Sequence, residues 1–139
     1  MKIKAIQEEI IDEFAMFEDW DERYQYLIDL GKTLPLIDEQ YKTEDNIIKG
    51  CQSKVWLHGK QEGSEIVFTA DSDAILTKGI IAILIRVFSN QESADILKAD
   101  TDFIDEIGLK EHLSPTRANG LVSMIKQIKM YALAFQAKN

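Results

Sequence analysis

The sequence has one cysteine, two histidines, two prolines and no long hydrophobic run, and each scarcity excludes a class of structure or chemistry. A single cysteine cannot form a disulfide within the chain, and an iron–sulfur cluster requires several thiolates. One cysteine and two distant histidines lack the spacing of a zinc site. The longest apolar stretch, residues 79–88, contains Arg86 and is too short to span a bilayer. These scarcities favour a protein with no metal or cofactor of its own and no membrane segment.

Basic side chains are also scarce, with 16 Lys and Arg against 24 Asp and Glu, which gives a net charge of −8. Nucleic-acid binding requires clustered Lys and Arg, so this balance argues against a nucleic-acid partner. The charge is uneven, since residues 1–45 sum to −8, residues 46–109 to −4 and residues 110–139 to +4. We interpret the acidic N-terminal part as a solvated surface, with steering of a basic partner as the alternative.

The composition, 45% apolar and 29% charged, is that of a folded globular protein. The length predicts one domain, residues 1–139, with a real hydrophobic core. No basic leader followed by an apolar segment opens the chain, which predicts no secretory signal. An unpaired cysteine without an export signal favours the reducing cytoplasm.

Apolar side chains at helical spacing near the N-terminus predict an amphipathic helix: Ile3, Ile6, Ile10, Phe14 and Phe17. Asp19 has the form of an N-cap for a second helix, which begins at Trp20 and ends at Gly31. We assign the aromatic side chains of Trp20, Tyr24 and Tyr26 to the core.

The middle of the chain predicts a loop followed by a β-hairpin. Residues 36–54 have no periodicity and are expected to form a long loop, of a length that is often functional in a compact domain. Residues 55–58 and 66–70 favour strands, and residues 59–64 between them have turn chemistry.

The remaining sequence predicts helices. Residues 74–89 are apolar on nearly all sides, which indicates a central, buried helix, and Gly79 within it favours tight packing. Short helices are expected at residues 93–98 and 102–107, and Ser114-Pro115 begins the last helix as an N-cap followed by proline. The predicted fold class is α+β, a single domain with a small antiparallel sheet packed with helices.

Cys51 is the residue best placed for chemistry. A structural cysteine usually lies within an apolar periodic segment, whereas Cys51 follows Gly50 on the predicted loop, where a side chain can be presented to a partner. Lys49 and Lys54 flank it with no nearby acidic residue, so we expect a positive local field that lowers the thiol pKa. The alternative is an inert cysteine.

Two histidines and one helix add secondary candidates. His58 and His112 are the available bases for a cysteine hydrolase, but neither has a signature around it, and both are interpreted as ordinary surface or partly buried histidines.

Arg117 occupies the first turn of the last helix, where a cation opposes the helix dipole. Such violations cluster at functional sites, and a surface ion pair is the alternative. Gly120 in the same helix predicts the close approach of another backbone.

Three ordered motifs give the chain a resemblance to the SufE family, the sulfur acceptors of iron–sulfur cluster assembly, which include CsdE-like proteins. The motifs are Gly50-Cys51-Gln52-Ser53-Lys54-Val55-Trp56, Asp71-Ser72-Asp73-Ala74 leading into Lys78-Gly79, and Leu113-Ser114-Pro115-Thr116-Arg117-Ala118-Asn119-Gly120-Leu121. The resemblance covers essentially the whole chain and is weakest at residues 59–64 and 90–110. It implies a fold shared with the IscU-type scaffold.

The resemblance also implies a function. In SufE-like proteins the cysteine that matches Cys51 takes a sulfane sulfur from a PLP-dependent cysteine desulfurase (SufS- or CsdA-like), stimulates that enzyme, and passes the sulfur to an iron–sulfur scaffold complex (SufBCD-like). Cys51 is then the catalytic residue, with Gly50, Gln52, Ser53 and Arg117 in supporting roles. PLP belongs to the partner, and the chain acts as a persulfide carrier rather than an independent turnover enzyme.

Transfer of a persulfide between proteins needs one reactive cysteine, not two, which fits this composition. The resemblance implies an apolar recess that shelters the persulfide, and Val55, Trp56 and the helix of residues 74–89 are its candidate walls. We expect the loop to move about Gly50 when a partner docks. Two other interpretations stay open: a scaffold that itself binds a cluster or metal, and a non-catalytic interaction module.

Overall fold

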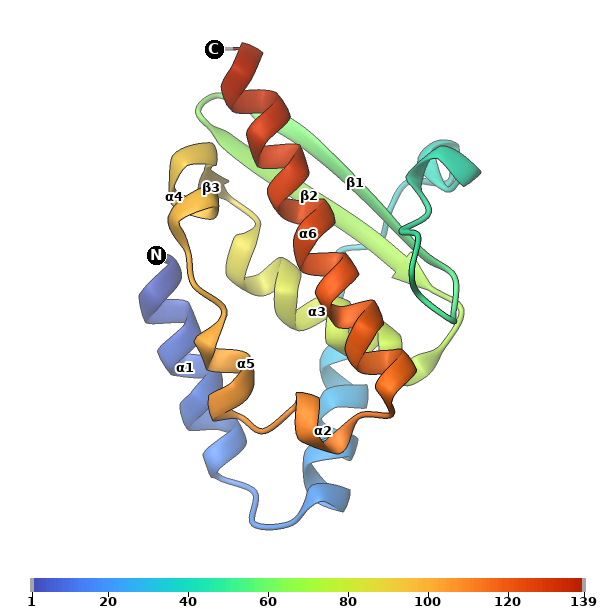
Figure 1. Cartoon of the computed structure of the whole chain (residues 1–139), viewed down its shortest axis with the longest axis vertical. Coiled ribbons are helices and arrows are strands. Elements are labelled where there is room, and N and C mark those ends of the chain that lie inside the picture. The colour runs from blue at the N-terminus through green and yellow to red at the C-terminus, as the bar shows by residue number, and fades with distance from the viewer. Residues whose placement is uncertain (1, 139) are drawn as a thin grey trace.

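The structure is a computed structural model that describes residues 2–138, and its elements agree with the predicted α+β class (Figure 1). The helices are α1 (Ile3–Ala15), α2 (Trp20–Gly31), α3 (Ile75–Phe88), α4 (Ser93–Lys98), α5 (Asp102–Glu106) and α6 (Pro115–Lys138). The strands β1 (Val55–Glu62), β2 (Glu65–Ser72) and β3 (Gln91–Glu92) form one antiparallel sheet in the order β1-β2-β3. Short 3₁₀ turns are η1 (Glu39–Tyr41), η2 (Glu44–Asn46) and η3 (Lys110–His112).

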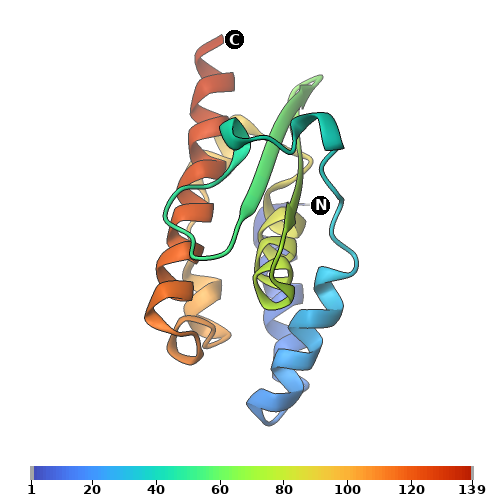
Figure 2. The same cartoon turned by 90° about the vertical axis from the view of Figure 1, so that its right-hand side faces the viewer.

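Helix α3 is the centre of the molecule, as its apolar sequence predicts. It packs against α1, α2, α6 and β2, and its residues from Gly79 to Ile85 are all buried. Helix α6 runs along the hairpin on one side of the molecule, while α2 lies on the other (Figure 2). The core is therefore one continuous cluster in which a single helix contacts both the sheet and the surrounding helices.

The hairpin is longer than the sequence predicts. Its eight-residue strands pair continuously from Val55 opposite Ser72 to Glu62 opposite Glu65. The turn is therefore only Gly63 and Ser64, and the predicted turn at residues 59–64 is wrong in extent. Gly63 has φ +62, a conformation that glycine adopts without the steric cost that other residues pay.

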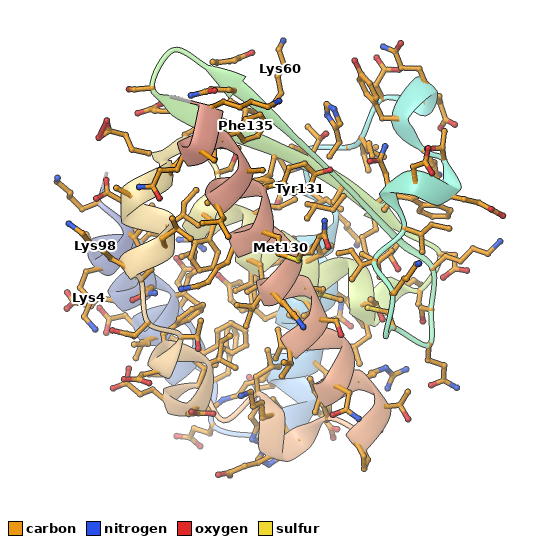
Figure 3. All side chains as sticks on the ribbon, turned by 45° about the horizontal axis from the view of Figure 1, so that its top comes forward. Lys4, Lys60, Lys98, Met130, Tyr131 and Phe135 are labelled. Atoms are coloured by element: carbon orange, nitrogen blue, oxygen red, sulfur yellow. The ribbon has the colours of Figure 1, made fainter. Side chains whose placement is uncertain are left out.

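A glycine within β1 allows α6 to pack closely on the sheet. A Cβ atom on Gly59 would lie 2.9 Å from both Phe68 Cε1 and Tyr131 Cδ1. The Tyr131 ring on α6 (Figure 3) meets the Phe68 ring edge to face with centroids 5.8 Å apart. The part of β1 around Gly59, which has turn chemistry in the sequence, therefore remains in the strand. The Tyr131 ring fills the space that a side chain at Gly59 would occupy.

The segment of residues 36–54 is more ordered than the predicted loop. Leu36 pairs with Ala70 of β2, and Ile47 pairs with Trp56 of β1, so the segment is joined to both strands of the hairpin. Between these points η1 and η2 lie over the outer face of the sheet, where the Tyr41 ring stacks on His58 with centroids 3.9 Å apart. Hydrophobic periodicity could not predict these contacts because they join strands to a segment without regular repeats.

The three aromatic residues assigned to the core lie at its edge instead. Trp20, Tyr24 and Tyr26 are each only partly buried. The Trp20 ring stacks on His112 at 3.8 Å between centroids, and the Tyr24 hydroxyl donates to the His112 carbonyl oxygen. These rings carry polar groups that need partners, so they fix the ends of helices rather than fill the interior.

Candidate functional site

Cys51 lies at the tip of a loop that two anchors hold to the hairpin. We call residues 49–54 the cysteine loop. Before it, the Ile48 N–H donates to the Val55 carbonyl oxygen at 2.8 Å. At its end, the Lys54 N–H donates to Asp73 Oδ1 at 3.0 Å, and the Asp73 N–H donates to the Lys54 carbonyl oxygen at 3.2 Å. Hydrogen bonds thus fix both ends of the loop and leave its tip free of backbone pairing.

The cysteine loop closes against the first turns of α6. The Cys51 thiol donates a weak hydrogen bond to the Gly120 carbonyl oxygen, with a sulfur–oxygen distance of 3.6 Å. A Cβ atom on Gly120 would lie 3.3 Å from Cys51 Sγ and 3.7 Å from Cys51 Cα. Gly120 does mark a close approach, but the nearest atom is the side-chain sulfur of the candidate nucleophile and not a backbone atom as predicted.

The Cys51 side chain is half-buried and faces a small recess between the loop, α3 and α6. The free volume of the recess is about 10 Å³, the space of roughly one water molecule. Helix α3 contributes to its wall as predicted, whereas Val55 and Trp56, the other predicted walls, do not line it. Besides Cys51 the lining residues are Gln52, Ser53, Thr77, Ile80, Thr116, Arg117, Gly120 and Met124.

Burial raises the pKa of the Cys51 thiol above its usual value. This corrects the expectation that Lys49 and Lys54 lower it. Both lysine side chains are exposed to solvent, which screens their charge, while the loss of water around the sulfur disfavours the thiolate. At neutral pH the resting cysteine is therefore a protonated, weakly nucleophilic thiol.

Arg117 is placed beside Cys51 by the N-terminus of α6. Ser114 caps the helix, with its hydroxyl oxygen accepting from the Arg117 N–H at 3.3 Å, and Pro115 follows as the first helical residue. The Arg117 side chain lines the recess and is exposed, and within residues 2–138 no carboxylate lies within 4 Å of it. The alternative of an ordinary surface ion pair is therefore wrong, and the guanidinium is free to meet an anion.

The other candidates on the cysteine loop are Gln52, Ser53 and Gly50. Gln52 is exposed and Ser53 partly buried, and both line the recess. Gly50 has φ +96, and a Cβ atom there would lie 2.5 Å from Ser123 Oγ, so the position requires glycine both for its backbone angle and for space.

Neither histidine lies in the recess. His58 stacks on Tyr41 on the outer face of the sheet, and His112 stacks on Trp20 beside η3. Across the described residues, 2–138, no group of three or more His, Cys, Asp or Glu side chains is arranged to hold a metal ion. In the same part of the chain no helix is both long enough and apolar enough to cross a membrane.

Two functional residues escaped the sequence interpretation. Asp73 was named only within the motif Asp71-Ser72-Asp73-Ala74, yet its carboxylate holds the end of the cysteine loop, while Ser72 Oγ accepts from the Ala74 N–H at 3.2 Å. Thr77 is 6% exposed and lines the recess from α3. A threonine among apolar neighbours was the available signal for Thr77, since a buried hydroxyl needs a partner.

Comparisons with known proteins bear on the family and on the fold. A sequence profile of the SufE family, described as an Fe-S metabolism associated domain, matches residues 8–132. A SufE-like protein of Rhizobium meliloti is 43% identical over 130 residues, which are 90% of this chain and 93% of that protein. A SufE-like protein of Rhizobium etli is 40% identical over 130 residues, covering 90% of this chain and 88% of the relative.

Two further matches come from more distant proteins. SufE-like protein 1 of Arabidopsis thaliana, chloroplastic/mitochondrial, is 37% identical over 132 residues, and this chain spans 36% of its length. A solution structure of a hypothetical protein from Thermus thermophilus shares the fold at a TM-score of 0.78 and 18% identity, covering 93% of this chain and 94% of that one. Six of the nine residues that line the recess belong to the motifs that carried the resemblance: Cys51, Gln52, Ser53, Thr116, Arg117 and Gly120. The chain belongs to the SufE family of Fe-S metabolism proteins.

Proposed function

We propose that this protein accepts sulfur from a PLP-dependent cysteine desulfurase, carries it as a persulfide on Cys51 and delivers it to an iron–sulfur scaffold complex. The observation that supports this most is the placement of Cys51. The chain's only thiol lies at the tip of an anchored loop, in a recess with free space for about one further atom. A carrier needs such an arrangement because a persulfide must be reachable for transfer and sheltered between transfers.

The chemistry of loading is thiol–disulfide exchange and needs no external oxidant. The Cys51 thiolate attacks the outer sulfur of a cysteine persulfide on the donor, and a new sulfur–sulfur bond forms while the donor's bond breaks. The donor cysteine leaves as a thiolate and takes up the proton that Cys51 has given up. Delivery repeats the same exchange with an acceptor thiol, so one cysteine serves both steps.

The burial of Cys51 makes loading depend on the partner. Because burial raises the pKa of its thiol, the resting protein attacks slowly. We infer that docking draws the tip of the cysteine loop out of the recess, with Gly50 as the hinge and the anchors at Ile48 and Lys54 left in place. Removal of sulfur from the desulfurase frees that enzyme for another cycle, which accounts for stimulation of the desulfurase.

Arg117 and Gln52 are the supporting residues we assign to this exchange. The exposed Arg117 side chain lines the recess and has no carboxylate partner among residues 2–138, so its guanidinium can attract an anionic sulfur or the thiolate leaving the donor. Gln52 is exposed next to Cys51 and has both donor and acceptor atoms for a partner surface.

The test is sulfur loading followed by intact mass without reductant. The protein is mixed with a cognate cysteine desulfurase and cysteine, and a gain of one or more sulfur atoms that a reductant reverses is expected. Cys51→Ser, which replaces one sulfur by oxygen at the same site, should gain none. An unchanged wild-type mass beside a desulfurase that is shown to be active would reject the carrier function.

Hydrogen exchange over residues 44–54 tests the loop movement separately. Docking of the desulfurase should change exchange at the tip of the cysteine loop while the Ile48 and Lys54 amides keep their protection. Identical exchange with and without the partner would mean that the loop stays closed.

A further inference from the structure

We propose that the sulfur donor docks in a groove beside the cysteine loop, and that it fills this groove with an apolar side chain flanked by carboxylates. The inference rests on the proposed carrier function and adds the surface through which the partner binds. The groove, which we call the α6 groove, lies between the segment that enters the cysteine loop and the middle turns of α6 (Figure 2). Its main walls are Ile47, Ile48 and Lys49 on one side and Ser123, Lys126 and Met130 on the other.

The first observation is the size and lining of the α6 groove. Its free volume is about 320 Å³, against about 10 Å³ for the recess at Cys51. A hollow of this volume is within the range that holds small ligands, and it admits a large side chain of a partner. Ile48 is 3% exposed and Met130 is 53% exposed, so the groove offers apolar atoms both in its depth and at its rim.

The second observation is a row of exposed apolar side chains on α6 that includes Met130. Val122 is 49% exposed and Leu133 is 58% exposed, and the helical spacing of residues 122, 130 and 133 places all three on one face of the helix. Single apolar side chains on a surface are ordinary, whereas a row of them beside a hollow is typical of a protein–protein contact.

The third observation is the charge of this face. Helix α6 and the cysteine loop carry six basic residues and no acidic one, in a chain of net charge −8. The Lys129 ammonium group donates to two backbone carbonyl oxygens near the end of α4. Lys49 and Lys126 are exposed, and among residues 2–138 no carboxylate lies within 4 Å of either. Asp45 also lines the groove, so two lysines and one aspartate leave it positive. This charge is complementary to an acidic rim on a partner.

The hinge of the cysteine loop separates the α6 groove from the recess. Lys49 lines the groove and Cys51 lines the recess, with Gly50 between them in the sequence. Gly50 lies against the groove wall, since a Cβ atom there would be 2.5 Å from Ser123 Oγ. A partner side chain in the groove therefore contacts the chain beside the hinge, which links docking to the release of Cys51.

Two arguments assign the groove to the sulfur donor. Cys51 is a free thiol in this structure, which is the form that a donor meets, whereas an acceptor meets a persulfide. A second copy of this chain is a poorer occupant, because a two-fold contact would bring the lysines of the groove toward the same lysines of the other copy.

The experiment measures the affinity of a cognate cysteine desulfurase for each variant by calorimetry, without cysteine so that no sulfur is transferred. Lys126→Glu should weaken binding about 10-fold in ~50 mM salt and less in ~300 mM salt, because salt screens the charges. Met130→Ser should weaken binding about 5-fold at both salt concentrations, because it removes apolar contact area. Both side chains are exposed, so neither change disturbs the core.

Each groove variant has a matched control elsewhere on the surface. Lys4→Glu makes the same change of charge at an exposed lysine on α1, away from Met130 (Figure 3). Met16→Ser makes the same change at a methionine that is 77% exposed and lies outside the groove. Both control variants should bind the desulfurase as wild type does.

The outcomes are distinct. Equal affinities for wild type and the groove variants, or equal losses in groove and control variants, would overturn the docking site and leave the carrier function intact. Self-association that Met130→Ser abolishes in sedimentation would place a second copy in the groove, and weaker binding of a scaffold complex alone would place the acceptor there. Either result would overturn the assignment to the donor. Failure of wild type to gain sulfur from an active desulfurase would overturn the carrier function, whatever the affinities.

Discussion

A glycine in a helix makes a close contact at two places in this molecule, and the two contacts differ in the kind of atom that the glycine meets. At the crossing of α2 and α3, a Cβ atom on Gly79 would lie 2.1 Å from the Leu27 carbonyl oxygen. At the crossing of α6 and the cysteine loop, a Cβ atom on Gly120 would lie 3.3 Å from the Cys51 sulfur. The first contact is with backbone in a paired helix, and the second is with a side chain on a loop.

The difference teaches where this fold is rigid and where it can move. Two helices that meet on glycine backbones, Gly31 against Gly79, cannot separate without losing the packing of the core. The tip of the cysteine loop contacts α6 through Cys51 and through the approach of Gly50 to Ser123, with one weak hydrogen bond, and can leave at a smaller cost. Glycine thus serves permanent packing at one crossing and temporary storage of a reactive group at the other.

The largest expected effect on the stability of the fold is that of Gly79→Ala. The added methyl group would overlap the Leu27 carbonyl, and because that atom belongs to helix backbone, α2 must shift as a whole. We expect a loss of about 3 kcal/mol in the free energy of unfolding, measured by urea titration, and a fall in Tm of roughly 10 °C. A stability equal to that of wild type would show that the α2–α3 crossing is as adaptable as the loop contact.

An intermediate effect on stability is expected for Arg86→Met, which tests how α1 is held to the central helix α3. Arg86 Nη1 donates to Glu13 Oε1 at 2.7 Å, and Nη2 donates to Glu9 Oε1 at 3.1 Å. Methionine keeps the stem and removes the charge. We expect a loss of about 1–2 kcal/mol in the free energy of unfolding at pH 7, since both groups are only partly buried.

The pH dependence of that loss has a definite sign. Arg86 and the Tyr26 hydroxyl hold the pKa of Glu13 below its ordinary value of 4.5, although burial opposes them. The stabilisation is therefore complete above pH 4.5 and is lost as the pH falls through the lowered pKa of Glu13. Urea titrations of wild type and Arg86→Met should converge as the solution is acidified, and a constant difference down to pH 3 would contradict the assignment.

The smallest effect on stability is expected for Gly120→Ala, the counterpart of Gly79→Ala. Alanine favours the helix by up to about 1 kcal/mol, and the sulfur can give way to the methyl group, so the free energy of unfolding should stay within about 1 kcal/mol of wild type. The displaced Cys51 should react several-fold faster with a thiol-labelling reagent at pH 7.5, because its burial decreases.

A large loss of stability in Gly120→Ala, or unchanged labelling, would break the comparison between the two glycines. Cys51→Ser serves as the control for labelling, since it has no thiol to react.

The sequence predicted the parts of the site that depend on a residue's own element. Ser114 and Pro115 begin α6 as expected, and Gly120 revealed a close approach because glycine is costly within a helix. The sequence could not show that the approaching residue is Cys51, since the contact joins positions 69 residues apart. The pKa of Cys51 was misjudged for the same reason, because local charges are visible in a sequence and burial is not.

The same distinction between local and distant contacts separates the parts of the fold that the sequence predicted from those that it did not. The hairpin, α3 and the start of α6 follow from periodicity and capping, which are local. The extension of β1 through Gly59 depends on Tyr131 of α6, and the order of residues 36–54 depends on both strands of the hairpin. Elements that owe their shape to a distant partner carry no periodic signal of their own.

The anchors of the cysteine loop limit how far Cys51 can move from the surface of the protein. Between Ile48 and Lys54 the chain makes six Cα–Cα steps, roughly 20 Å when fully extended, so its middle can advance by at most about 10 Å. Any protein that gives sulfur to Cys51 and any protein that takes it must come within that radius of the same point. Under the proposed carrier function, the sulfur donor and the sulfur acceptor therefore bind the same site in turn, and delivery begins only after the donor has dissociated.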